Sequence, residues 1–164
     1  GSGKTTLAKY LYQKIKILRK NTIYLDGDLI RKCFSMEEDN DYTIESRRKN
    51  AKRIQQLSLI LDNEKINVIC AIQLIFNDIR SNNHKLFSIY KEIHITCSAE
   101  TLKERDTKNL YKLFEEKKTK NIVGLDIPYP KPNYYNFELN SDENIDKTLR
   151  RIDKISEQLI PDIF

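Results

Sequence analysis

The sequence is short of the residues that metal centres and disulfide-bonded domains require. Its 164 residues include three cysteines and two histidines. Cys33, Cys70 and Cys97 are odd in number and far apart, with no CxxC pair, which argues against a disulfide framework and against a zinc site. His84 and His94 are isolated from each other, so a histidine-based metal cluster is not expected.

Long apolar runs are also absent. No run of 18 apolar residues occurs, so the sequence predicts neither a membrane span nor a secretory signal peptide. Hydrophobic residues make up 39% of the chain and charged residues 32%, a balance typical of a globular domain, which we expect to be cytoplasmic. The length predicts a single domain covering residues 1–164, and a domain of this size buries about two-thirds of its unfolded surface.

The net charge of +5 raises the question of a nucleic-acid partner. Lysines are spread through every predicted helix, and the sequence has neither a Gly/aromatic RNA-binding motif nor an arginine-rich tail. We therefore expect no nucleic-acid partner. Small anionic substrates account for the charge equally well.

The chain is organised around residues 1–8, which match the end of a P-loop. In a P-loop, glycines let backbone N–H groups surround phosphates, a lysine reaches the terminal phosphates, and a hydroxyl binds Mg²⁺. The predicted cofactor-binding residues are Gly1, Ser2, Gly3, Lys4, Thr5 and Thr6. The full pattern begins with a glycine five residues before Gly3. We therefore expect that residue, and the first strand of the domain, to lie upstream of Gly1.

An alternative interpretation is that the N-terminal Gly-Ser-Gly is left over from a cleaved expression tag. The context favours the P-loop, because an apolar stripe near helical period follows directly, as a P-loop helix requires. A short strand is then expected at residues 22–25, and Asp26 and Asp28 follow where that strand should end. Carboxylates at this end of a strand lie where an open α/β sheet builds its site.

The remaining pattern alternates between strands and helices. The further predicted strands are residues 67–72, 92–96 and 136–139. The further predicted helices are residues 43–63, 76–90 and 142–159. Thr43 and Ser98 are expected to cap helices, and residues 36–42 predict a loop. With right-handed crossovers, this order predicts an α/β fold with a doubly wound, mainly parallel sheet and flanking helices.

Six motifs, in this order, resemble the adenylylsulfate kinase family, which uses ATP to phosphorylate the ribose 3′-hydroxyl of adenosine 5′-phosphosulfate. The motifs are residues 1–8, 25–28 with Arg31, 34–35, 47–50, 105–111 and 124–129. The resemblance covers nearly the whole chain. It implies a P-loop kinase with a small lid, ATP as co-substrate, Mg²⁺ bound with the nucleotide, and a homodimer by analogy.

The residue types suit phosphoryl transfer. Lys4 and a Mg²⁺ ion bound to Thr5 would neutralise charge on the β- and γ-phosphates. A sugar hydroxyl also needs a carboxylate that orients it as it loses its proton. Asp28 is our first choice for this catalytic role, and Asp26 either shares it or holds Mg²⁺ through water. The alternative is that both aspartates belong to a solvated turn.

The resemblance implies roles for residues outside the P-loop. The arginines among them would meet the anionic 5′ end of the substrate, and Phe34 would stack on the base. Arg105 and Lys108 would belong to a lid that closes over ATP. The residues implied in substrate binding are Asp28, Arg31, Phe34, Arg47, Asn50, Lys108 and Asp126.

Departures from the family pattern fall mostly on the acceptor side. The family's Ile-Ser-Pro is Ile-Gln-Leu at residues 72–74, and its Phe-Thr-Gly is Ile-Val-Gly at residues 122–124. The serine of the family's Ile-Ser-Pro, proposed there as a phosphorylated intermediate, is thus missing. We therefore expect the phosphate to pass directly from ATP to the substrate. The pattern resembles the cytidine diphosphoramidate kinases of bacterial capsule synthesis, so cytidine diphosphoramidate is the favoured acceptor, ahead of adenylylsulfate. Two alternatives stay open, namely a kinase for another small hydroxyl compound and a non-catalytic nucleotide-binding regulatory module.

Overall fold

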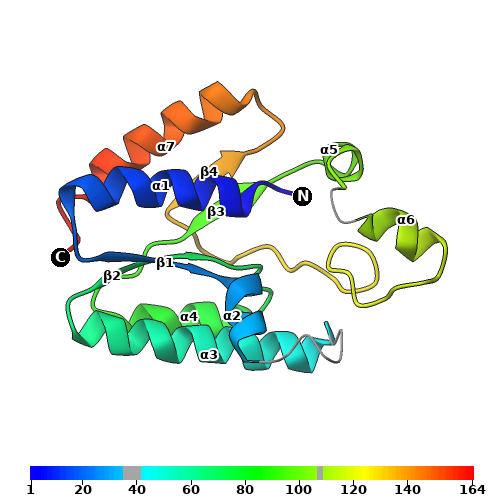
Figure 1. Cartoon of the computed structure of the whole chain (residues 1–164), viewed down its shortest axis with the longest axis horizontal. Coiled ribbons are helices and arrows are strands. Elements are labelled where there is room, and N and C mark those ends of the chain that lie inside the picture. The colour runs from blue at the N-terminus through cyan, green and yellow to red at the C-terminus, as the bar shows by residue number, and fades with distance from the viewer. Residues whose placement is uncertain (35–41, 107–108) are drawn as a thin grey trace.

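The computed structural model describes residues 1–34, 42–106 and 109–164. Helices and strands alternate along this chain (Figure 1). In chain order they are α1 (Lys4–Leu18), β1 (Thr22–Asp26), α2 (Gly27–Cys33), α3 (Ile44–Asn63), β2 (Asn67–Ala71), α4 (Asn77–Leu86), β3 (Ile93–Thr96), α5 (Ala99–Glu104), α6 (Leu110–Glu115), β4 (Phe137–Asn140) and α7 (Ile145–Leu159).

The named strands pair in parallel, as the sequence predicts. β1 pairs with β2, which places Asp26 opposite Ala71. β3 pairs with β4, which places His94 opposite Glu138. In the described part of the chain these pairs form two separate ladders, and the strand expected before Gly1 stays a prediction.

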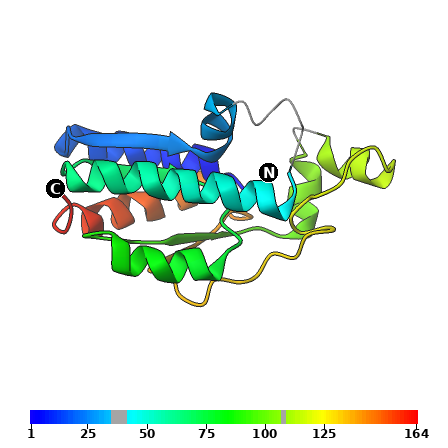
Figure 2. The same cartoon turned by 90° about the horizontal axis from the view of Figure 1, so that it is seen from below.

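Helices cover both faces of the strands (Figures 1 and 2). On one face α1 packs against α7, and on the other α3 packs against α2 and α4. The start of α1, the start of α2 and helix α5 lie at the carboxyl ends of the strands (Figure 1). An α/β fold places its site at this edge. Within residues 1–34, 42–106 and 109–164, none of the helices has the length and apolar character needed to cross a bilayer.

Two apolar clusters hold the layers together. The larger joins α1, β4 and α7 through buried side chains at helical spacing, which are Leu7, Leu11, Ile15, Leu139, Ile152, Ile155 and Leu159. The smaller lies between α3 and α4 and consists of Ala51, Ile75, Phe76, Ile79 and Ile127. The predicted apolar stripe of α1 is therefore confirmed as its buried face.

Side-chain hydrogen bonds set where several helices begin. The predicted caps are confirmed, since Thr43 Oγ1 accepts from the Ser46 N–H (3.3 Å) and Ser98 Oγ accepts from the N–H of a residue in the first turn of α5. The helix predicted from residue 142 begins only at Ile145. This prediction was wrong at its start because Asp142 accepts from the Ser98 N–H (3.0 Å) and stays outside the helix.

The helix predicted over residues 76–90 is also shorter than expected, because α4 ends at Leu86. Asp62, on α3, accepts hydrogen bonds from the backbone N–H (2.9 Å) and the hydroxyl (2.6 Å) of Ser88. This contact fixes Ser88 in the connection to β3. Its partner lies far away in the sequence, so local periodicity gives no sign of it.

A buried ion pair joins α4 to the start of β3. The side chains of Arg80 and Glu92 form this pair and are 9% and 10% exposed. Arg80 also donates to the backbone carbonyl of Leu74, which follows β2. Two charges removed from water remain favourable only while each keeps its partner. The pair therefore ties α4 and the end of β2 to β3.

Replacing Glu92 with alanine should lower the free energy of unfolding by about 3–5 kcal/mol, because Arg80 would stay buried without its counter-charge. Urea unfolding followed by circular dichroism measures this loss. The control is Lys147→Ala on α7, which breaks a more exposed pair with Glu143 (3.2 Å) and should cost less than about 1 kcal/mol. Equal losses in the two variants would contradict the prediction.

Candidate active site

The predicted phosphate-binding turn lies directly before α1. Gly3 has a φ of 78°, a left-handed conformation that glycine adopts without strain, and the helix begins at Lys4. Lys4 Nζ donates to Ser2 Oγ (3.2 Å), and Thr6 is exposed in the first turn. Backbone N–H groups at a helix start, with a lysine beside them, suit an anionic phosphate.

Thr5 connects this turn to the end of β1. Its hydroxyl donates to Asp26 Oδ2 over 3.1 Å. A hydroxyl and a carboxylate at this distance are hard oxygen ligands of the kind that Mg²⁺ prefers. Across the described ranges, no group of three or more His, Cys, Asp and Glu side chains could hold a metal ion. A magnesium ion here would therefore take further ligands from the nucleotide and water.

Asp26 carries several hydrogen bonds at the end of β1. Its Oδ1 caps α2 by accepting from the N–H groups of Asp28 (3.0 Å) and Leu29 (3.3 Å), and its Oδ2 accepts from the Tyr24 hydroxyl (2.8 Å). Burial alone raises the pKa of Asp26, but the hydrogen bonds outweigh it and hold the pKa below its ordinary value. Burial and the Asp26 charge raise the pKa of Tyr24, so the phenol keeps its proton and donates.

Asp28 lies in the first turn of α2, and its side chain is exposed. An exposed carboxylate is accessible to an incoming hydroxyl group, whereas both oxygens of Asp26 already accept hydrogen bonds. Arg47 lies at the same edge, because it donates to Gln73 Oε1 just after β2, and β2 pairs with β1. The structure therefore brings Asp26, Asp28 and Arg47 to one edge of the sheet.

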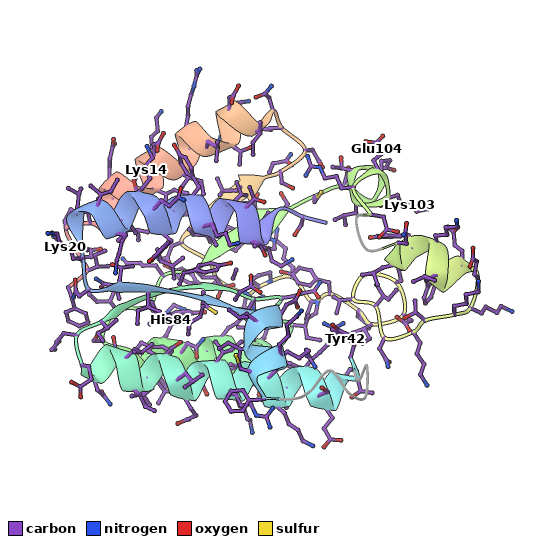
Figure 3. The ribbon with its side chains drawn as sticks, viewed as in Figure 1. Lys14, Lys20, Tyr42, His84, Lys103 and Glu104 are labelled. Atoms are coloured by element: carbon purple, nitrogen blue, oxygen red, sulfur yellow. The ribbon has the colours of Figure 1, made fainter. Side chains whose placement is uncertain are left out.

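Two arginines lie against one aromatic ring at the start of α3. Arg31 is 5% exposed and donates to Ser46 Oγ (2.8 Å). The guanidinium carbons of Arg31 and Arg47 lie 4.8 Å and 5.4 Å from the centre of the Tyr42 ring. Figure 3 labels Tyr42 beside the N-terminal end of α3. Two neighbouring cations held on one ring form a positively charged site for an anion.

Arg47 is fixed by contacts with three other segments. Its Nε donates to the Tyr42 carbonyl (2.8 Å), its Nη1 to Gln73 Oε1 (3.3 Å) and its Nη2 to the Asn121 carbonyl (2.9 Å). Burial and the nearby charge of Arg31 lower the pKa of Arg47. These bonds use three of the five N–H groups of a guanidinium, so Arg47 is oriented but can still bind a ligand.

Asn50 and Phe34, both implied in substrate binding, have protein partners. Asn50 is 5% exposed and donates from Nδ2 to the Gly27 carbonyl (3.1 Å). A Cβ atom on Gly27 would lie 3.3 Å from the Ala71 carbonyl oxygen, so glycine allows α2 to begin this close to β2. The exposed Phe34 ring lies 4.8 Å from the guanidinium of Arg53. Substrate contacts of Asn50 and Phe34 stay predictions.

The predicted lid residues are only partly described. Arg105 follows α5 and donates to the Ser141 carbonyl (2.8 Å) at the end of β4. Helix α5 lies close to the phosphate-binding turn, because a Cβ atom on Gly1 would lie 3.3 Å from Leu102 Cδ2. Lys108 lies outside the described residues. Arg105 therefore lies at the predicted edge of the sheet, and its closure over ATP stays a prediction.

Asp126 closes a turn that is in contact with Arg47. Its Oδ2 accepts from the Asn121 N–H (2.6 Å) and its Oδ1 from the Ile122 N–H (2.5 Å). Burial alone raises the pKa of Asp126, but these hydrogen bonds and the charge of Arg47 lower it. The carbonyl of Asn121 is the one to which Arg47 donates. Asp126 thus supports Arg47 through the backbone, an arrangement that the sequence did not predict.

The sequence reasoning assigned no role to Tyr24, Tyr42 or Gln73. Tyr24 lies two residues before Asp26, and the period of a strand places both side chains on one face. Gln73 follows β2 at the carboxyl edge, where sites form. These two signals were available. Tyr42 gives no local signal, because its role depends on arginines from α2 and α3.

A glycine turn into a helix with Lys4 and Thr5, bonded to a carboxylate at the end of a parallel strand, defines a P-loop phosphotransferase. The sequence model of the family described as Adenylylsulphate kinase matches residues 1–140. The chain therefore belongs to the adenylylsulphate kinase family. It is an ATP-dependent phosphotransferase with an alcohol group as acceptor.

Individual relatives agree with this assignment. The chain is 38% identical to the cytidine diphosphoramidate kinase of Campylobacter jejuni subsp. jejuni serotype O:2, over 80% of this chain and 76% of that protein. It is 29% identical to an adenylyl-sulfate kinase of Clostridium kluyveri, over 97% and 78%. The structure of the Mycobacterium tuberculosis APS kinase CysC in complex with AMPPNP and APS superposes with a TM-score of 0.80 at 22% identity, covering 96% of this chain and 92% of that one. The predicted P-loop kinase fold is thereby confirmed.

Because of the hydrogen bonds to Asp26, the free energy of unfolding should fall as the pH is lowered. The folded pKa of Asp26 lies below its unfolded value, so its contribution is present above about pH 4 and is lost as the pH falls through the folded pKa. Tyr24→Phe removes one hydrogen bond and should reduce the loss of stability between about pH 6 and pH 3. Thermal unfolding at several pH values measures this loss. Tyr12→Phe, on the ring that packs beside Tyr24, is the control, and an unchanged acid dependence in Tyr24→Phe would refute the prediction.

Asp126→Ala should raise the KM for the acceptor by about tenfold, because the Asn121 carbonyl would no longer be held against Arg47. The KM for ATP should stay within about twofold of wild type, since the phosphate-binding turn is untouched. Steady-state kinetics with each substrate varied in turn measures both constants. Asp126→Asn keeps a side-chain oxygen that can accept a hydrogen bond, so it should raise the KM for the acceptor substrate less than Asp126→Ala does. Equal increases in both KM values would argue for a general loss of structure.

Proposed function

We propose that this chain transfers the γ-phosphate of ATP to the ribose 3′-hydroxyl of a nucleotide with a modified 5′ end, and that cytidine diphosphoramidate is its acceptor. The observation that carries this proposal is the hydrogen bond from Thr5 to Asp26, which lies two residues before the exposed Asp28 and at the same edge of the sheet as Arg47. The identity to the Campylobacter jejuni kinase supports the choice of acceptor.

On the donor side, the turn from Gly1 to Gly3 and the start of α1 would bind the phosphates of ATP. Lys4 would neutralise charge on the β- and γ-phosphates. Thr5 would bind Mg²⁺ directly, and Asp26 would hold the same ion through water. The ion would neutralise the charge that develops on the transferred group. The Thr5–Asp26 hydrogen bond supports this role because it keeps both oxygen ligands together.

Asp28 is the proposed catalytic base. The 3′-hydroxyl would donate to its carboxylate and lose its proton as the bond to phosphorus forms. Asp28 suits this role better than Asp26 because Asp28 is exposed and Asp26 is half-buried. Asp26 caps α2 and accepts from Tyr24. Asp26 thus aids the reaction by fixing the turn that presents Asp28.

On the acceptor side, Arg31 and Arg47 would bind the anionic 5′ end. Their charges lie side by side, and the charge of Arg31 already lowers the pKa of Arg47. A bound anion would relieve this repulsion, which favours a ligand with negative charge at that point. The further proposed substrate contacts are Phe34, Asn50, Lys108 and Asp126, the last through the turn that holds Arg47. Closure of a lid with Arg105, and a homodimer, rest on analogy with the family.

Adenylylsulfate is the second candidate acceptor. The relative from Clostridium kluyveri, which spans nearly the whole chain, is named an adenylyl-sulfate kinase. The two acceptors carry the same kind of reacting hydroxyl and differ in the base and in the group at the 5′ end. The donor-side geometry therefore favours neither, and the choice between them depends on the acceptor side.

The proposal predicts ATP turnover with cytidine diphosphoramidate, at a kcat/KM at least about tenfold above that with adenylylsulfate. Coupled measurement of ADP formation gives the rates, and ³¹P NMR of the product locates the new phosphate. Asp28→Asn should lower kcat by about 10²–10⁴-fold and still bind ATP. A preference for adenylylsulfate would show that adenylylsulfate, and not cytidine diphosphoramidate, is the acceptor. Absence of turnover with both nucleotides would refute the proposed function.

A further inference from the structure

Gln73 is the acceptor-side residue to which the proposed chemistry gives no task. It lies two positions after the end of β2, at the edge of the sheet where Asp26 and Asp28 lie. Its side chain is exposed, so a ligand can reach it. Its Oε1 accepts from Nη1 of Arg47 over 3.3 Å. Gln73 therefore lies directly beside the guanidinium proposed to bind the 5′ end of the acceptor.

The contact with Arg47 orients the carboxamide. A guanidinium has only donors, so the oxygen of the amide must face Arg47 and the NH₂ group must point away from it. The oxygen has two lone pairs, and Arg47 uses one of them. Gln73 thus offers a neutral group that can accept one more hydrogen bond and donate two, next to a fixed positive charge.

The arginines alone cannot distinguish one anionic 5′ end from another. Guanidinium groups only donate, so Arg31 and Arg47 suit phosphate, sulfate and phosphoramidate oxygens alike. A phosphoramidate differs because its nitrogen carries N–H donors, which need an acceptor. When the ligand has an oxygen at that position, two acceptors face each other, and this repulsion discriminates between ligands.

We infer that Gln73 is a specificity-determining residue that recognises the terminal group of the acceptor's 5′ end. Its Oε1 accepts from the phosphoramidate N–H, and its Nε2 donates to a phosphoryl oxygen. Arg47 keeps the amide in the orientation that both bonds need. This inference rests on the proposed function and extends it, because it names the residue that recognises the phosphoramidate nitrogen of the acceptor.

The test compares cytidine diphosphoramidate with cytidine 5′-diphosphate, two acceptors that differ by one NH₂ group in place of an oxygen. Wild type should favour the phosphoramidate in kcat/KM by about tenfold or more. In Gln73→Met, whose side chain has a similar length but no amide, this ratio should fall to within about threefold of one. The KM for ATP should stay within about twofold of wild type.

Gln55→Met is the matched control, because Gln55 lies on α3 and donates to Asn83 Oδ1, whereas Gln73 accepts from Arg47. It should keep the wild-type ratio, and thermal unfolding shows whether each variant is folded. If Gln73→Met keeps the wild-type preference for the phosphoramidate, the inference is overturned and the proposed function stands. If the wild-type protein phosphorylates neither cytidine nucleotide, the proposed function fails, and the inference fails with it.

Discussion

The carboxylate of Asp26 is the interaction on which the site depends. It lies where β1 ends and accepts hydrogen bonds from the hydroxyl that follows the phosphate-binding turn, from Tyr24 on the strand, and from the first N–H groups of α2. One ionised group thereby joins three elements whose directions differ. Hydrogen bonds to a charged acceptor are stronger than those between neutral groups, so this junction is well suited to hold the reacting groups in place.

The acceptor side depends on a different kind of constraint. The partners of Arg47 come from three separate parts of the sequence. Its guanidinium is held by acceptors before α3, after β2 and in the turn closed by Asp126. Two of these three acceptors are backbone carbonyls, and the position of the Asn121 carbonyl depends in turn on the Asp126 side chain. The position of this positive charge is therefore set by segments that lie far apart in the sequence.

The sequence predicted the features that depend on local signals. The apolar period of α1, the cap at Thr43 and the aspartates at the end of β1 each follow from a few adjacent residues, and the structure confirms their positions. The errors and omissions involve contacts between distant segments. Asp142 is held by Ser98 and starts no helix. Beside the buried Ala51 and Ile54, α3 also buries polar residues such as Ser46 and Asn50, whose partners belong to α2.

The same difference between local and distant contacts bears on how specificity can change within the family. The donor side is built from two short stretches, residues 1–6 and 24–29, whose side chains bond to one another. A substitution of Asp26 would disturb the proposed magnesium ligands and the turn that presents the proposed base together. The proposed acceptor side draws on several separate segments, and a change after β2 would alter the partner of Arg47 without altering Thr5 or Asp26. On the proposed assignment, one phosphoryl-transfer site can serve different nucleotides, because the groups proposed to transfer phosphate and those proposed to select the acceptor are attached to different parts of the chain.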